Sequence, residues 1–123
     1  MKLSKSEEEL MQYLWKLEKA YMNELLECYP DPRPASTTVA TLLKRMREKG
    51  FVGYQQLGRS RQYYPLVKKS VYFSKYLKGL IHRFFDDSPS EFASFFASET
   101  DLTEEELKEL RQIISKELEK KKK

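Results

Sequence analysis

The chain has 123 residues, of which 40% are hydrophobic, and a formal net charge of +4. This length and composition predict a globular protein with one core of moderate size, or a small domain with an appendage, and exclude a disordered chain. The single cysteine, Cys28, excludes an internal disulfide and a metal site of clustered cysteines. The sequence lacks both the roughly 20 apolar residues in a row of a membrane helix and the apolar core of a signal peptide. We therefore expect a cytoplasmic protein with no membrane insertion, no metal and no cofactor.

The charge is distributed unevenly along the chain. Residues 1–85 contain 16 Lys and Arg against 8 Asp and Glu, whereas residues 86–123 contain 7 against 11. Residues 33–69 carry nine basic residues and a single acid, Glu48. Positive charge concentrated in this way is typical of a nucleic-acid-binding surface.

The first predicted helix lies near the N-terminus. Ser6 and Glu9 have the spacing of a capping box at its start. Its broad apolar face consists of Leu10, Met11, Leu14, Trp15 and Leu17. Because Trp15 lies on this stripe, we assign it to the core and not to a ligand-binding platform.

A shorter second helix is expected after Tyr21. Leu25 and Leu26 face inward in this helix. The three prolines in residues 29–34 then end it, because proline lacks the backbone N–H of a helix interior. These two helices are expected to support the basic segment that follows.

Residues 36–49 have the pattern of an amphipathic helix. Ser36 is expected to cap its N-terminus and Gly50 to end it. Its apolar face consists of Val39, Leu42, Leu43 and Met46. Its opposite face carries Thr37, Thr41 and Lys44. A solvated surface helix would show the same pattern, but the following segment favours a DNA-reading helix.

After Gly50 the hydrophobic period falls to about two residues, which predicts a strand. A turn is expected at residues 57–61 and a returning strand at 62–65, with Arg59 and Arg61 at the tip. Two helices, a basic helix and a hairpin form a winged helix-turn-helix, whose third helix enters the major groove. Charge also keeps an edge hairpin soluble, but beside a basic helix we favour phosphate contact for both arginines.

From about residue 70 the pattern is helical only. One helix is expected to end near Phe85, a short helix to begin at Ser88, and a last helix to begin at Thr103. The four C-terminal lysines are expected to form a frayed basic tail. The predicted fold is therefore mainly α with a small β-hairpin: a winged helix-turn-helix DNA-binding domain at residues 1–69, followed by a helical dimerisation region at residues 70–123.

These helices carry more apolar surface than a chain of this size can cover. A homodimer would bury it, and the predicted interface consists of Phe73, Leu77, Leu80, Phe84, Phe92, Phe95, Phe96, Leu107, Leu110 and Ile114. A two-fold symmetric dimer also places two reading helices about 34 Å apart, one turn of DNA. The alternative is a monomer whose helices fold back on the winged domain.

These features together resemble the penicillinase repressor family, the BlaI/MecI/CopY type. The resemblance is carried by residues 38–50, the wing return at 61–65, the first helix with Trp15, and residues 102–114, and it covers nearly the whole chain. It implies a dimeric winged-helix repressor that binds a palindromic operator in double-stranded DNA. Such repressors block transcription of resistance genes, of the β-lactam type among others, and often of their own operon.

The resemblance also implies roles for individual residues. The base contacts that it implies are Thr37, Ala40 and Thr41, and we predict Thr38 as a further one. The predicted DNA backbone contacts are Ser36, Lys44, Arg45, Arg59, Ser60 and Arg61. Relatives often carry a basic residue where this chain has Ala40. The base contact at this position is therefore expected to be lost, or to be limited to an apolar contact between the alanine side chain and the methyl group of a thymine.

In the β-lactam-responsive branch, a membrane sensor protease system triggers cleavage within the dimerisation region. The cleaved bond usually joins Asn and Phe, and the matching pair here is Phe95 and Phe96. We keep this pair as a candidate proteolytic site but favour interface core for both residues. The copper-responsive branch has a cysteine-rich tail, which this chain lacks.

Other functions are less well supported by the sequence. His82, the only histidine, has no Ser, Cys or Asp at a catalytic spacing, so we expect no enzyme. One alternative is a winged-helix regulator that senses a small molecule through Tyr72, Tyr76 and Phe84. The other is a winged-helix module used only for protein contacts.

Overall fold

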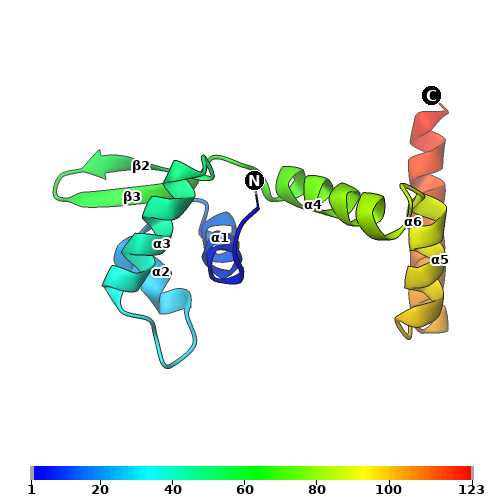
Figure 1. The fold of residues 1–123 in the computed structure, drawn as a ribbon, viewed down its shortest axis with the longest axis horizontal. Helices are drawn as coiled ribbons and strands as arrows, with labels where there is room; N and C mark the ends of the chain where they lie inside the picture. The colour runs from blue at the N-terminus through cyan, green and yellow to red at the C-terminus, as the bar shows by residue number, and fades with distance from the viewer. Residues whose placement is uncertain (1, 123) are drawn as a thin grey trace. The chain divides into compact units, whose positions relative to one another are not determined.

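The computed structural model describes residues 2–122, and the chain divides into two compact units with the boundary between Ser74 and Lys75. The first unit contains α1 (Lys5–Leu17), β1 (Ala20–Tyr21), α2 (Met22–Cys28), α3 (Ser36–Glu48), β2 (Val52–Leu57) and β3 (Ser60–Pro65) (Figure 1). The boundary falls within α4 (Lys69–Phe84), and the second unit continues with α5 (Pro89–Glu99) and α6 (Glu104–Lys121). The predicted fold class, mainly α with a small hairpin, is confirmed. Among residues 2–122, no helix combines the length and the apolarity needed to cross a membrane.

The core of the first unit lies among its helices and against the sheet. Its largest fully buried side chains are Leu10, Met11, Leu14, Leu25, Val39, Leu43, Met46 and Val52, together with the acid Glu7. The predicted apolar face of α3 is confirmed, with Leu42 half-buried at its edge. Leu17 was expected on the apolar face of α1 but is exposed, because α1 ends there and Glu18 turns the chain with φ of 69°.

Trp15 attaches the start of α4 to α1. Its indole Nε1 donates a hydrogen bond of 2.8 Å to the carbonyl oxygen of Val67. Its ring centroid lies 5.9 Å from that of Tyr72 and 5.9 Å from that of Phe73. The assignment of Trp15 to the core is confirmed, with the side chain half-buried against it.

The sheet is antiparallel, in the order β1-β3-β2. Tyr63 of β3 pairs with Ala20 of β1 on one side and with Tyr54 of β2 on the other. Tyr63 is buried, so this face of the sheet packs on the core. Because alternate residues of a strand point to the same face, Arg61 lies on the same face as Tyr63.

The hairpin turn is shorter than the sequence pattern indicated. Leu57 pairs with Ser60, so the turn contains only Gly58 and Arg59, not residues 57–61. Gly58 has φ of 63° at the first turn position, where two-residue hairpins favour glycine. Ser60 and Arg61 therefore belong to β3, and only Arg59 lies at the tip.

Two predicted helix caps are wrong. The capping box of α1 is formed by Ser4 and Glu7, two residues before the predicted pair of Ser6 and Glu9. In both pairs the glutamate follows the serine by three positions, and the helix begins at the pair whose glutamate, Glu7, is buried in the first unit. The N-cap of α3 is Ala35, which has no side-chain acceptor, so Ser36 is the first helical residue.

The predicted ends of the remaining helices are largely confirmed. Gly50 follows α3 with φ of 84°, a left-handed conformation typical of a helix end. Ser88 caps α5, and Thr103 forms a capping box with Glu106 on α6. The basic tail is not frayed as expected, since α6 continues to Lys121; Lys123 lies outside the described residues.

The second unit differs from the first in its burial. None of its described residues, 75–122, is buried in the single chain. The rings of Phe85, Phe92, Phe95 and Phe96 contact one another within α5 and the preceding turn. This unit therefore has apolar side chains but no closed core of its own.

Candidate nucleic-acid interface

The predicted DNA contacts on α3 share its exposed face. The exposed residues of this helix are Ser36, Thr37, Thr38, Ala40, Thr41, Lys44 and Arg45, together with the acid Glu48 at its end. Val39, Leu43 and Met46 are buried, which fixes the rotation of α3 about its axis and so fixes which side chains face solvent. The sequence periodicity thus places the predicted base and backbone contacts of this helix on one surface.

The threonine hydroxyls of this surface are not equivalent. The Oγ1 of Thr41 donates a hydrogen bond of 3.0 Å to the carbonyl oxygen of Thr37. With its proton engaged, this hydroxyl retains lone pairs that accept a hydrogen bond, and the side chain retains its methyl group. Thr41 is therefore suited to an amino donor or a thymine methyl in the major groove.

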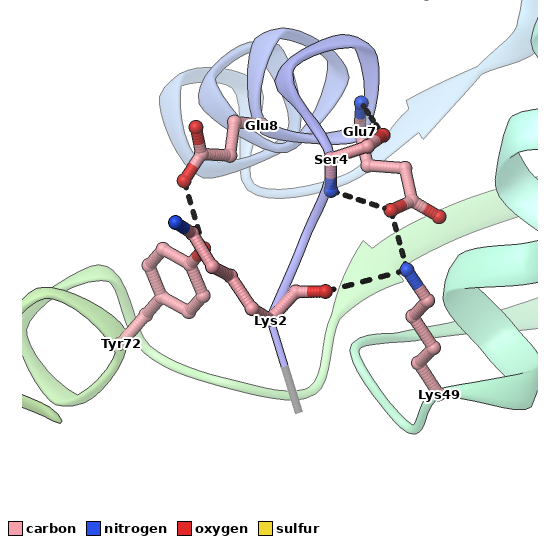
Figure 2. A network of polar contacts seen from close by, with 6 residues as sticks. All are labelled: Lys2, Ser4, Glu7, Glu8, Lys49 and Tyr72. Atoms are coloured by element: carbon pink, nitrogen blue, oxygen red, sulfur yellow. Dashed lines mark hydrogen bonds and ion pairs between the residues drawn. The ribbon is translucent and has the colours of Figure 1, made fainter. Parts of the chain in front are cut away.

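An ion pair between a partly exposed lysine and a buried acid attaches the C-terminal end of α3 to α1 (Figure 2). The Nζ of Lys49, the C-cap of α3, lies 2.6 Å from Oε1 of Glu7 and donates a second, longer bond to the carbonyl oxygen of Lys2. The same Oε1 accepts a hydrogen bond of 2.7 Å from the backbone N–H of Ser4. One carboxylate oxygen thus joins the start of α1 to the end of α3.

The Glu7 carboxylate stays charged despite its burial. It is only 1% exposed, and burial alone would raise its pKa. Hydrogen bonds from Lys49 and Ser4 and the charge of Lys49 outweigh burial and hold the pKa of Glu7 below its ordinary value of 4.5. Its other oxygen, Oε2, is buried and has no hydrogen-bond partner within residues 2–122. The negative charge therefore depends on the contacts of Oε1.

A second polar contact joins α1 to α4. The hydroxyl of Tyr72 donates a hydrogen bond of 2.8 Å to Oε2 of Glu8, as Figure 2 shows. The ring of Tyr72 is buried and lies 5.7 Å from that of Phe51. Tyr72 was a candidate for lining a ligand pocket in the helical half, but the structure places it in the core of the first unit.

Arginines of α3 and β3 meet on one aromatic ring of β2. The Cζ of Arg61 lies 4.3 Å from the ring centroid of Tyr54, and the Cζ of Arg47 lies 5.0 Å from it. Arg47 belongs to the last turn of α3, so the ring joins that helix to the hairpin. Such contacts are cation–π interactions.

A groove of about 650 Å³ lies between α2 and the hairpin. Its lining includes Asn23 and Leu26 of α2 and the hairpin residues Arg59, Ser60 and Arg61. Within residues 2–122, neither arginine forms an ion pair with a carboxylate. The groove thus combines hydrogen-bond donors with positive charge that no acid neutralises, as a phosphate site requires.

The structure groups the predicted contacts in two places, the exposed face of α3 and the hairpin. The pair of Glu7 and Lys49 and the cluster around Tyr54 were not predicted from the sequence. The first joins residues 42 positions apart and leaves no local signal. The second follows from strand alternation only after the two-residue turn is known, because the turn decides which face Arg61 occupies.

The chain is similar to known proteins over most of its length. The family model described as penicillinase repressor matches residues 3–116. Methicillin resistance regulatory protein MecI from Mammaliicoccus sciuri is 30% identical over 115 residues, covering 93% of this chain and 94% of the relative. MecI from Staphylococcus aureus (strain N315) matches to the same extent. The penicillinase repressor of Bacillus licheniformis is 27% identical over 113 residues, covering 91% of this chain and 88% of the relative.

The fold is also similar to a solved structure. The crystal structure of a MarR mutant from E. coli aligns with a TM-score of 0.52 and 13% identity, over 94% of this chain and 78% of that chain. At this identity the likeness concerns the fold alone. It confirms the winged-helix arrangement predicted from the sequence.

Proposed function

Because this chain belongs to the penicillinase repressor family, we propose that it is a homodimer that represses transcription by occupying a palindromic DNA operator. The family consists of winged-helix transcriptional repressors, so the chain is a repressor and not an enzyme. The observation that carries the proposal is the exposed row of threonines and basic residues on α3, held in place by the buried face beneath it. We call α3 the recognition helix and the β2–β3 hairpin the wing.

In this proposal the recognition helix lies in the major groove. Thr37, Thr38, Ala40 and Thr41 face base edges, with Ala40 limited to methyl contact. Lys44 and Arg45 of the helix and Arg59, Ser60 and Arg61 of the wing contact phosphates. Because no side chain caps the recognition helix, its first N–H groups and the Ser36 hydroxyl are placed to donate to a phosphate as well.

The second unit supplies the proposed dimer contact, together with Phe73, which lies on α4 at the end of the first unit. Phe84 is 70% exposed and Ile114 is 64% exposed in the single chain. The other proposed interface residues, from Phe73 to Leu110, are exposed or half-buried. Apolar surface of this extent is unfavourable in water and marks a protein contact. A second copy satisfies it and also supplies the second recognition helix that a palindrome needs.

We propose resistance genes and the repressor's own operon as targets, because relatives are named for methicillin resistance and penicillinase. Such a repressor works in the cytoplasm. Release from the operator is proposed to involve the dimer contact. The bond between Phe95 and Phe96 lies inside α5, where the Thr100 hydroxyl donates to the Phe96 carbonyl oxygen, so a sensor-triggered protease would first have to unfold this turn. We therefore assign both residues to the interface.

Operator binding tests this function directly. Fluorescence anisotropy is measured with a palindromic operator of the family type and with random DNA of equal length, at about 50 and 200 mM salt. A repressor that contacts roughly six to ten phosphates should lose about 10³- to 10⁵-fold in affinity over this range. Strong preference for the operator supports the proposal. Binding without sequence preference or salt dependence would instead indicate a module for protein contacts.

Base readout and backbone contact should respond differently to substitution. Thr41→Ala is expected to weaken operator binding by about 1–3 kcal/mol while leaving random DNA nearly unchanged, because it removes a base contact. Arg61→Ala should weaken both DNAs alike and lower the salt slope by about 1, because it removes a phosphate contact. Anisotropy titrations with the two DNAs measure both effects. Equal effects of the two substitutions on both DNAs would refute the assigned roles.

A further inference from the structure

Tyr54 contacts one arginine from each of the two elements proposed to bind DNA. Its ring lies 4.3 Å from the Cζ of Arg61 in the wing and 5.0 Å from the Cζ of Arg47 in the recognition helix. We propose that Tyr54 is a positioning residue that orients Arg61 toward a DNA phosphate and makes the wing and the recognition helix bind as one unit. The inference rests on the proposed DNA binding and adds a residue that sequence reasoning did not assign.

The chemistry of guanidinium explains why an aromatic ring suits this task. Arginine interacts with an aromatic ring through the face of its planar group, so the N–H donors in the plane stay available. Arg61 also lines the open groove between α2 and the wing, beside Arg59 and Ser60. A phosphate in this groove can accept two hydrogen bonds from Arg61 without displacing the ring. The Tyr54 ring therefore orients the N–H donors of Arg61 before DNA binds.

The ring is also the contact that holds both arginines. Within residues 2–122, no carboxylate forms an ion pair with Arg47 or Arg61. The Nε of Arg47 is buried and has no hydrogen-bond partner among these residues. The charge of Arg61 in the groove is therefore left for an external anion such as a DNA phosphate.

The ring can be removed without removing a hydrogen bond. The Tyr54 hydroxyl has no hydrogen-bond partner within residues 2–122, so Tyr54→Phe keeps the contact intact. This variant is expected to bind the operator within about 2-fold of the unmodified chain. Tyr54→Leu keeps an apolar side chain but loses the ring, and it is expected to bind about 3- to 30-fold more weakly, the range that corresponds to a partly desolvated cation–π contact.

A double-mutant cycle separates positioning from a general loss of structure. Tyr54→Leu is combined with Arg61→Ala, and operator affinity is measured by anisotropy at several salt concentrations. If the ring acts through Arg61, Tyr54→Leu should cost less than about 2-fold once Arg61 is absent. Its salt slope should also approach that of Arg61→Ala, which loses about one phosphate contact. Trp15 fluorescence during thermal unfolding shows whether each variant is folded.

A second pair of variants covers the case in which Tyr54→Leu does not fold. Arg61→Lys keeps the charge but loses the planar group, and about 3- to 10-fold weaker binding is expected. Arg33→Lys is the matched control, because Arg33 is exposed, lies outside the wing and the recognition helix, and has no ring contact within residues 2–122. It should bind within about 2-fold of the unmodified chain.

The outcomes distinguish this inference from the proposed function. If Arg61→Ala weakens operator binding while Tyr54→Leu does not, or if the two effects are additive, the positioning role is refuted and DNA binding stands. If Tyr54→Phe binds as weakly as Tyr54→Leu, the ring is not the acting group and the inference fails. If the unmodified chain shows no operator preference and no salt dependence, the proposed function itself fails.

Discussion

Replacing Lys49 with methionine is expected to lower the free energy of unfolding of the first unit by about 2–4 kcal/mol at neutral pH. The substitution leaves the Glu7 carboxylate 1% exposed and without its cation. Removing one partner of a buried pair costs more than the pair contributes, because the remaining charge cannot reach water. Lys49 itself is partly exposed, so water can reach the position that its ammonium group occupied. We therefore expect a smaller loss of stability than the largest losses measured when one partner of a fully buried ion pair is removed. Urea unfolding followed by Trp15 fluorescence measures it.

The pH dependence of this effect has a defined sign. In the unmodified chain the pKa of Glu7 is lowered below 4.5, so its contribution to stability is present above about pH 4.5 and is lost as the pH falls through the lowered value. Without Lys49, only the Ser4 hydrogen bonds oppose the effect of burial, so we expect the pKa of Glu7 to be higher in the variant and protonation at acidic pH to remove the unpaired charge. The difference between the two chains should therefore shrink between about pH 7 and pH 4.

Two controls identify the unpaired charge as the cause. Lys44→Met makes the same change at an exposed position of α3, and it should alter stability by less than about 0.5 kcal/mol. Glu7→Gln added to Lys49→Met removes the stranded charge and should restore part of the loss. The loss of stability in Lys49→Met could instead be constant with pH and unchanged by Glu7→Gln. That result would show that the loss comes from missing packing of the lysine side chain and not from an unpaired charge.

Patterns confined to one element were predictable from the sequence. The buried row of Val39, Leu43 and Met46 follows from helical periodicity, and it placed the exposed row of α3 correctly. The capping box of Thr103 and Glu106 is likewise local, since both residues lie within one turn. These signals were sufficient for the fold class and for the recognition helix.

Features that depend on choosing between local alternatives, or on contacts between elements, were not predictable. Ser4 and Ser6 each precede a glutamate at the same spacing, and only tertiary packing selects the box whose acid reaches Lys49. The wing register depends on a turn shorter by three residues, and this register decides that Arg61 meets Tyr54. Both contacts link the recognition helix to neighbouring elements. The exposed face of this helix was therefore predictable from the sequence, whereas the contacts that hold the helix in place were not.

Ile114→Asp is expected to convert the repressor to monomers and to weaken operator binding by at least about 100-fold. Ile114 is 64% exposed in the single chain, so the substitution should cost the chain's own folding little. In a dimer, however, burial of each isoleucine contributes about 1.5–3 kcal/mol, and a buried unpaired carboxylate costs still more. Because the dimer is two-fold symmetric, its interface contains the substitution twice. A monomer then binds a single half-site and loses the increase in affinity that comes from binding two linked half-sites.

Gln112→Asp is the matched control, because it adds the same charge two residues away, on roughly the opposite face of α6. Sedimentation velocity at several concentrations gives the oligomeric state, and anisotropy gives operator affinity. Monomers for Ile114→Asp and dimers for Gln112→Asp would place the contact on one face of α6. If Ile114→Asp remains a dimer, the same test with Phe84→Asp, at the 70% exposed end of α4, decides whether the contact lies on α4 instead. Dimers in both variants would refute this interface, because neither exposed apolar side chain would then be buried by a second copy.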